Sequence, residues 1–234
     1  MAFFQVKRRQ MHYVAPHAIV HKMVLELMRS NKDSFEGSKL PVKNEDELLQ
    51  TMLASGRSHL ANQIYVCRMI VAFFFKKYDK AEEMAKKLCD YRKQLIVRIV
   101  RIRDVYGLFF QGLVAFRLSR SKEDEPEWMS FGEEAVVTFQ SWAKHSEWNF
   151  ENKLLLLQAE CHFSKGDGEA AERKYKLAIK SARKHRFLHE EGLAMDLLGL
   201  FYKSCGKTKE ESESFESARA CYKKWGAHGI LECS

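Results

Sequence analysis

Residues that interrupt helices are scarce in this sequence. Its 234 residues include only 3 prolines and 12 glycines, while leucine, alanine, lysine and glutamate are common. Proline removes a backbone donor and glycine costs backbone entropy, so their scarcity favours long helices. No segment alternates apolar and polar residues for long enough to indicate a β-sheet. The composition therefore predicts an all-α protein.

Long apolar runs are also missing. The longest are residues 69–75 and 154–157, well short of the roughly 20 residues that cross a bilayer. The short apolar run at the N-terminus precedes its charges, which is the reverse of the order in a secretory signal. We therefore expect a cytoplasmic protein with no membrane span.

Motifs for metal binding and catalysis are absent as well. The six cysteines are scattered without a CxxC pair, so reduced, buried thiols are favoured over disulfides or zinc. His17 and His21 stand four apart and could face one metal ion, but no third ligand is apparent, and a solvated helix face is the alternative. Neither a Walker phosphate loop nor a kinase signature occurs. We expect no metal, no cofactor and no enzymatic activity.

The apolar residues that are present recur with helical spacing. They predict an N-terminal helical segment over residues 1–56, paired helices over 57–226 and a tail over 227–234. The paired helices are expected near 57–76, 79–92, 94–119, 129–145, 150–165, 168–185, 188–205 and 208–225. Turn residues such as Tyr78-Asp79 and Gly206 mark their joints.

The chain repeats itself at an offset of about 40 residues, a period typical of helical repeats. When Gly166 is aligned with Gly206, small residues and rings coincide: Ala159 with Gly199, His162 with Tyr202, Tyr175 with Phe215, and Ala178 with Ala218. This order of small and aromatic residues resembles the tetratricopeptide pattern. The resemblance implies antiparallel helix pairs, about four of them, stacked as a right-handed solenoid.

The last 85 or so residues carry a closer resemblance. The strings from Ala178 to Ala194, from Leu198 to Tyr202 and from Ala218 to Ala227 resemble the C-terminal helical repeats of large multidomain signalling ATPases. Those proteins join kinase, nucleotide-binding and histidine-kinase modules. The resemblance implies a scaffold or regulatory arm whose partner is a protein or peptide, with an ATPase or kinase domain as one candidate.

In tetratricopeptide-like folds the first helix of each pair lines a concave face that binds peptides or helices. Carried onto this sequence, that rule predicts a partner-binding set made of Tyr106, Phe109, Phe116, Lys153, Glu160, Phe163, Asp196 and Lys203. The set mixes apolar and charged residues. Packing and solubility explain the same residues, so both interpretations stay open.

A basic stripe offers a second kind of site. Arg92, Lys93, Arg98, Arg101 and Arg103 are interleaved with aliphatic residues. Such a stripe could bind an anionic surface or nucleic acid, or it could be the solvated face of an amphipathic helix. No nucleic-acid recognition signature accompanies it, so nucleic acid is not the expected partner. Binding that collapses with salt, or on exchange of Arg98 and Arg101 for glutamate, would favour the anionic partner.

Overall fold

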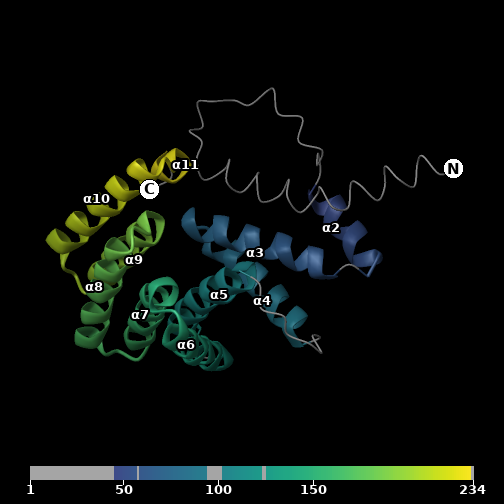
Figure 1. Cartoon of the computed structure of the whole chain (residues 1–234), viewed down its shortest axis with the longest axis horizontal. Coiled ribbons are helices and arrows are strands. Elements are labelled where there is room, and N and C mark those ends of the chain that lie inside the picture. Colours follow the sequence, from purple (N-terminus) through teal and green to yellow (C-terminus); the bar gives the residue numbers. More distant parts are fainter. Residues whose placement is uncertain (1–44, 57, 94–101, 123–124, 233–234) are drawn as a thin grey trace.

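The computed structural model describes residues 45–56, 58–93, 102–122 and 125–232, and the regular structure of these residues is helical (Figure 1). The helices are α2 (Glu45–Ala54), α3 (Ser58–Phe74), α4 (Tyr78–Lys93), α5 (Ile102–Ser121), α6 (Glu127–His145), α7 (Glu147–Ser164), α8 (Gly168–Lys184), α9 (Leu188–Ser204), α10 (Thr208–Trp225) and α11 (His228–Glu232). The predicted all-α class is confirmed.

Each helix expected between residues 57 and 225 is present, with ends within a few residues of the expected ones apart from the start of α5. The predicted helix over 94–119 appears as α5 from Ile102 onward, and residues 94–101 lie outside the description. The predictions for residues 1–44, including His17 and His21, also lie outside it. Within the expected C-terminal tail, the short helix α11 forms because Ile230 packs into the core, where it is 1% exposed.

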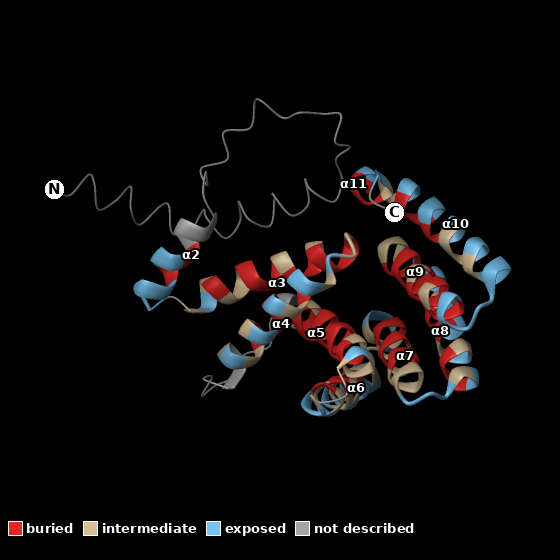
Figure 2. Ribbon diagram, turned by 180° about the vertical axis from the view of Figure 1, so that it is seen from behind, coloured by how far each residue is buried: buried red, intermediate tan, exposed pale blue. Residues whose placement is uncertain are grey.

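The helices pack mainly against their sequential neighbours as antiparallel pairs. A second set of contacts links α3 with α5, α5 with α7, and α7 with α9. We call α3, α5, α7 and α9 the inner helices. Figure 2 shows that buried residues predominate in α3, α5 and α9, whereas α8 and α10 alternate buried and exposed sides. The core therefore lies where the inner helices meet one another and their outer partners.

The pairs approach closely where one helix presents a glycine to an aromatic ring. A Cβ atom placed at Gly132 of α6 would lie 2.6 Å from the ring of Phe116 in α5, and one at Gly199 of α9 would lie 2.7 Å from the ring of Phe215 in α10. Two helix backbones come this close only when one side chain is reduced to hydrogen. The ring then fills the space that a larger side chain would occupy.

Six of the described turns between helices contain a left-handed residue. Positive φ angles occur at residues 56 and 76, and again at 166, 186, 206 and 226, which are 20 residues apart within each group. Glycine occupies four of these positions, but Lys76 (φ 56°) and Arg186 (φ 62°) occupy the others. A non-glycine residue in this region costs backbone energy, so its surroundings must hold it there.

The chain curls until its first inner helix contacts its last pair (Figure 1). The ring of Phe74, at the end of α3, lies 6.1 Å from that of Tyr222 and 6.0 Å from that of Trp225, both in α10. Lys76 follows α3 and pairs with Asp196 of α9 at 3.0 Å. The inner helices therefore surround a core that is made of their own side chains.

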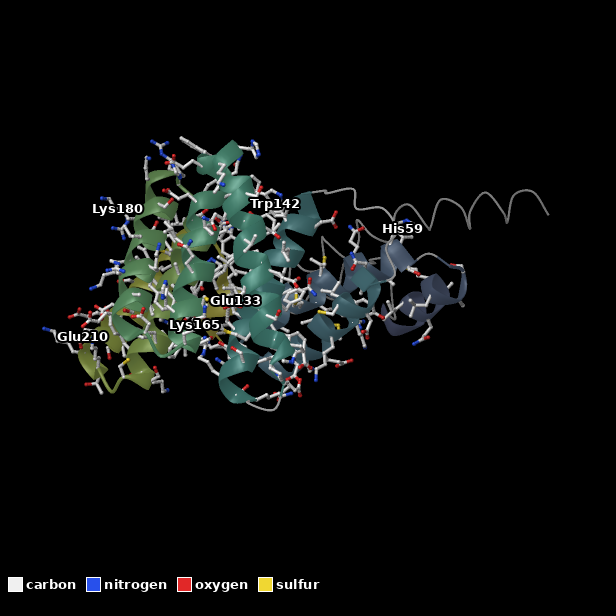
Figure 3. The ribbon with its side chains drawn as sticks, turned by 90° about the horizontal axis from the view of Figure 1, so that it is seen from below. His59, Glu133, Trp142, Lys165, Lys180 and Glu210 are labelled. Atoms are coloured by element: carbon white, nitrogen blue, oxygen red, sulfur yellow. The ribbon has the colours of Figure 1, made fainter. Side chains whose placement is uncertain are left out.

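The outer surface is polar. Figure 3 shows Glu133 of α6 and Lys165, just after α7, on this surface, and they form an ion pair at 2.7 Å. In the part of the chain that the structure describes, none of the helices combines the length and hydropathy needed to cross a membrane.

Candidate functional site

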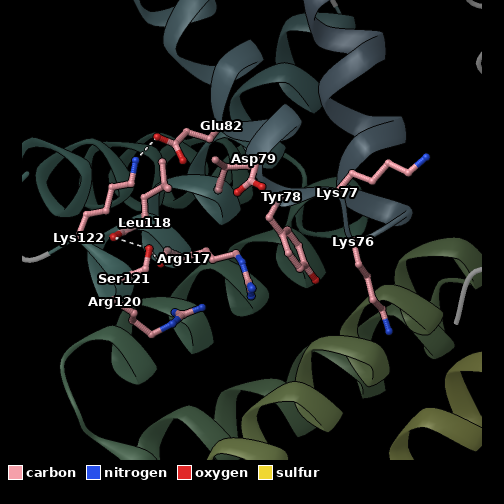
Figure 4. Close-up of a pocket in the computed structure, with 11 residues that line it drawn as sticks. Lys76, Lys77, Tyr78, Asp79, Glu82, Arg117, Leu118, Arg120, Ser121 and Lys122 are labelled. Atoms are coloured by element: carbon pink, nitrogen blue, oxygen red, sulfur yellow. Dashed lines mark hydrogen bonds and ion pairs between the residues drawn. The ribbon is translucent and has the colours of Figure 1, made fainter.

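A cavity opens between the α3–α4 turn and the C-terminal half of α5. Its volume is about 600 Å³, and Figure 4 shows its lining. We call it the Arg117 cleft. It is lined by Lys76, Lys77, Tyr78, Asp79, Glu82, Val114, Arg117, Leu118, Arg120, Ser121 and Lys122.

Cations outnumber carboxylates in this lining by five to two. Three of the cations are paired inside the chain. Lys122 pairs with Glu82, Lys76 with Asp196 at 3.0 Å, and Arg120 with Glu160 at 2.7 Å. The cleft therefore owes its unbalanced positive charge to its two remaining cations, Lys77 and Arg117.

Arg117 is the cation that the fold holds most firmly without a counter-charge. Its guanidinium carbon lies 3.5 Å from the centroid of the Tyr78 ring, and Figure 4 shows the side chain reaching from α5 toward that ring. Among the described residues, no carboxylate lies within ion-pairing distance of Arg117. The ring covers one face of the guanidinium and leaves its N–H edges available to a ligand.

Tyr78 is a neutral platform for this cation. Burial is the main cause that raises its pKa to about 12, and the charge of Arg117 opposes that rise. The phenol therefore keeps its proton at neutral pH. A cation over a partly desolvated ring is attracted by about 1–2 kcal/mol, which holds the guanidinium in one orientation.

A smaller pocket of about 180 Å³ adjoins the Arg117 cleft and shares Tyr78, Arg117 and Arg120 with it. We call it the apolar pocket, because the inner helices line it with Phe73, Leu113, Phe163, Leu197 and Leu200. Glu160 and Ser204 complete the lining. A charged cleft and an apolar pocket thus meet at Arg117.

Of the apolar residues in the predicted partner-binding set, Phe109 and Phe116 lie in the core, where they are 1% and 0% exposed. Phe163 is half-buried in the apolar pocket. Its ring lies 4.2 Å from the guanidinium carbon of Arg120. Of these three residues, Phe163 alone lines one of the two described cavities.

Two more predicted residues belong to a buried polar cluster that joins three inner helices. Lys153 of α7 pairs with Glu190 of α9 at 2.7 Å, and their side chains are 4% and 3% exposed. The Tyr106 hydroxyl of α5 donates to the same carboxylate at 3.0 Å. Burial alone would raise the pKa of Glu190, but the hydrogen bond from His189 and the charges of Lys153 and His189 outweigh it and lower that pKa to about 2. Lys153 and Tyr106 therefore already have a partner within the chain.

The remaining predicted residues are also engaged. The Glu160 carboxylate accepts a hydrogen bond from Tyr175 at 2.5 Å, and it also forms the ion pair with Arg120. Asp196 pairs with Lys76, and burial raises the pKa of Asp196 against the charge of that lysine. Lys203 is exposed, with its Nζ 4.0 Å from Glu211. The charged members other than Lys203 thus link helices to one another.

The predicted basic stripe lies outside the described side chains. Arg98 and Arg101 fall in residues 94–101, and the side chains of Arg92, Lys93 and Arg103 are not described either. Its role stays a prediction. Within the described ranges, no group of three or more His, Cys, Asp or Glu side chains is placed to hold a metal ion.

No pattern in the sequence indicates that Arg117 and Tyr78 lie together. They are separated by 38 intervening residues and a different helix carries each. Arg117 and Arg120 stand three apart on one helix, which indicates a shared face, but a solvated face produces the same spacing. Their common cleft depends on how α5 packs against the α3–α4 turn.

No family model matches this chain, and no match was found among curated proteins or among solved structures.

Proposed function

We propose that this protein is a binding module: a right-handed, tetratricopeptide-like array of helix pairs that holds a partner protein in the Arg117 cleft. A scaffold or regulatory arm of a signalling ATPase or kinase system is the setting that the resemblance of the last helices favours. The proposal assigns the protein no catalytic step.

The observation that carries this proposal is the state of Arg117. Charged groups that lose water are normally paired, because an uncompensated charge is costly. Arg120, three residues along the same helix, has a carboxylate partner at 2.7 Å. Arg117 has only the Tyr78 ring within the described structure, although it lines an open cavity of about 600 Å³. An acidic group of a partner would supply the counter-charge that Arg117 lacks.

Crosslinking from within the cleft tests the proposal. A photoreactive residue at Ser121, which is exposed on the lining, is expected to capture a partner in an extract of the native cells. The same residue at Lys180, which is exposed on α8 (Figure 3), serves as the matched control. We expect one product specific to Ser121, identifiable by mass spectrometry.

Charge reversal completes the experiment. Arg117→Glu should abolish the Ser121 product, whereas Lys180→Glu should leave it unchanged, with circular dichroism confirming that both variants are folded. A product that forms equally from position 180, or that survives Arg117→Glu, would rule out the cleft as the binding site.

A further inference from the structure

The Arg117 cleft carries enough chemistry to define the class of ligand that it takes. That ligand class rests on the proposed function and specifies its site. Two features bear on it: the charge distribution around Arg117, and the apolar pocket that begins at the same residue.

The charge distribution favours a ligand with a single negative charge. Asp79 lines the same cleft and would repel an anion with two charges. Lys77, the other cation without a carboxylate partner, points away from Arg117 (Figure 4). Lys76, Arg120 and Lys122 are each occupied by a carboxylate of this chain. A planar guanidinium held by its face offers two parallel N–H groups, which match the two oxygens of a carboxylate.

The apolar pocket favours a hydrocarbon side chain next to that carboxylate. Its walls include Phe73 of α3, Leu113 of α5 and Leu197 of α9, so an apolar group would exclude water from three inner helices at once. Burial of one such side chain contributes about 1.5–3 kcal/mol. Because Arg117 lines both cavities, the two groups of the ligand must lie close together.

We infer that the Arg117 cleft binds a peptide segment in which a carboxylate lies beside an apolar side chain, with the carboxylate on Arg117 and the side chain in the apolar pocket. The carboxylate can come from an aspartate or glutamate side chain or from the end of a chain, since both present the same pair of oxygens.

Selection from random peptides tests the inference without knowledge of the natural partner. The immobilised full-length protein is offered two hexapeptide libraries, one with amidated and one with free C-termini. We expect enrichment of an acidic residue adjacent to leucine, methionine, isoleucine or phenylalanine. Enrichment in the amidated library indicates a side-chain carboxylate, and enrichment confined to the other library indicates a terminal one.

Two variants test the contact with the carboxylate and the contact with the apolar side chain separately. Arg117→Gln should lower the affinity of the selected peptide about tenfold or more, as expected for loss of a charge-assisted hydrogen bond, and should abolish the preference for an acidic residue while keeping the apolar one. Leu200→Phe, which narrows the apolar pocket, should abolish the preference for an apolar residue while keeping the preference for an acidic one. Leu200→Met is the milder substitution if Leu200→Phe unfolds the protein. Lys180→Gln should change neither preference.

Three outcomes would overturn the inference: no enrichment in either library, enrichment that Arg117→Gln leaves intact, or tighter binding of phosphopeptides or oligonucleotides than of carboxylate peptides. Crosslinking from Ser121 remains an independent measure of the proposed function. A cleft-specific crosslink without carboxylate selection would contradict the ligand class alone, whereas loss of both would contradict the binding site itself.

Discussion

At the scale of single residues, buried polar groups in this protein differ in whether they have a partner. The Tyr175 hydroxyl donates to Glu160 at 2.5 Å. The Tyr222 hydroxyl is also buried but has no hydrogen-bond partner in the described part of the chain. Both rings are core residues, 0% and 2% exposed. The two tyrosines therefore form a natural pair for measuring what a satisfied hydroxyl contributes.

Removing the hydroxyl should lower stability at Tyr175 but not at Tyr222. Tyr175→Phe is expected to lower the free energy of unfolding by about 1.5–3 kcal/mol, because a hydrogen bond to a charged group is lost. Tyr222→Phe should leave stability unchanged or raise it by up to about 1 kcal/mol, since no bond is lost and a buried polar atom is removed. Urea denaturation of both variants measures the difference. Equal losses of stability in the two variants would show that the Tyr222 hydroxyl has a hydrogen-bond partner in solution.

Residue roles were the part of the site that the sequence could not predict. Helix position correctly places Lys153, Glu160 and Asp196 on inner helices, but it does not show how tightly those helices approach one another. Their approach buries Lys153 and Glu160 and gives all three an intramolecular partner. The pairing of Arg117 with Tyr78 likewise depends on a tertiary contact, which periodicity within a single helix does not contain.

At the scale of helices, the sequence was far more informative. Apolar spacing located every helix from α3 to α10, because each must bury one side. Joints at Gly166 and Gly206, which have positive φ angles, were visible because glycine tolerates that conformation. The equivalent positions Lys76 and Arg186 were not, since their residue type favours an ordinary helix. The short α11 was missed because its packing depends on contacts made by the rest of the fold.

Close packing between α5 and α6 can be tested at Gly132. Alanine is a better helix former than glycine by about 1 kcal/mol, yet its Cβ would lie 2.6 Å from the Phe116 ring, which is 0% exposed. Overpacking costs about 1–3 kcal/mol. We therefore expect Gly132→Ala to lower the melting temperature, and Phe116→Leu introduced with it to recover part of the loss.

The control lies on the same helix. Ser141 is exposed on α6, so Ser141→Ala should change the free energy of unfolding by no more than about 0.5 kcal/mol. A Gly132→Ala variant that is as stable as the unmodified protein would show that the two helices can separate without cost.

At the scale of the whole molecule, the contact of α3 with α10 distinguishes this fold from an open array. In an open array each unit touches only its neighbours, so a local change spreads stepwise. Here Phe74 contacts Tyr222 and Trp225 directly, although nearly 150 residues separate them. The first inner helix and the last pair should consequently share their stability.

Hydrogen exchange under native conditions tests that coupling. Phe74→Ala should reduce amide protection in α3 and also in the C-terminal half of α10, because a large core truncation costs about 3–5 kcal/mol and both helices lose the same ring. Phe139→Ala is the matched control, since the aromatic neighbours of Phe139 in the described structure lie in α5, α6 and α7. Phe139→Ala should lower amide protection in α10 only as far as it lowers the global free energy of unfolding. Protection lost in α3 alone would contradict the coupling.

The same contact limits how the length of the protein can change. An array whose ends are free can gain or lose a hairpin by duplication or deletion, and its other units keep their neighbours. In this protein an added hairpin between α3 and α10 would move Trp225 away from Phe74 and Asp196 away from Lys76. Variation in length should therefore be tolerated outside residues 74–225, and selected against within them.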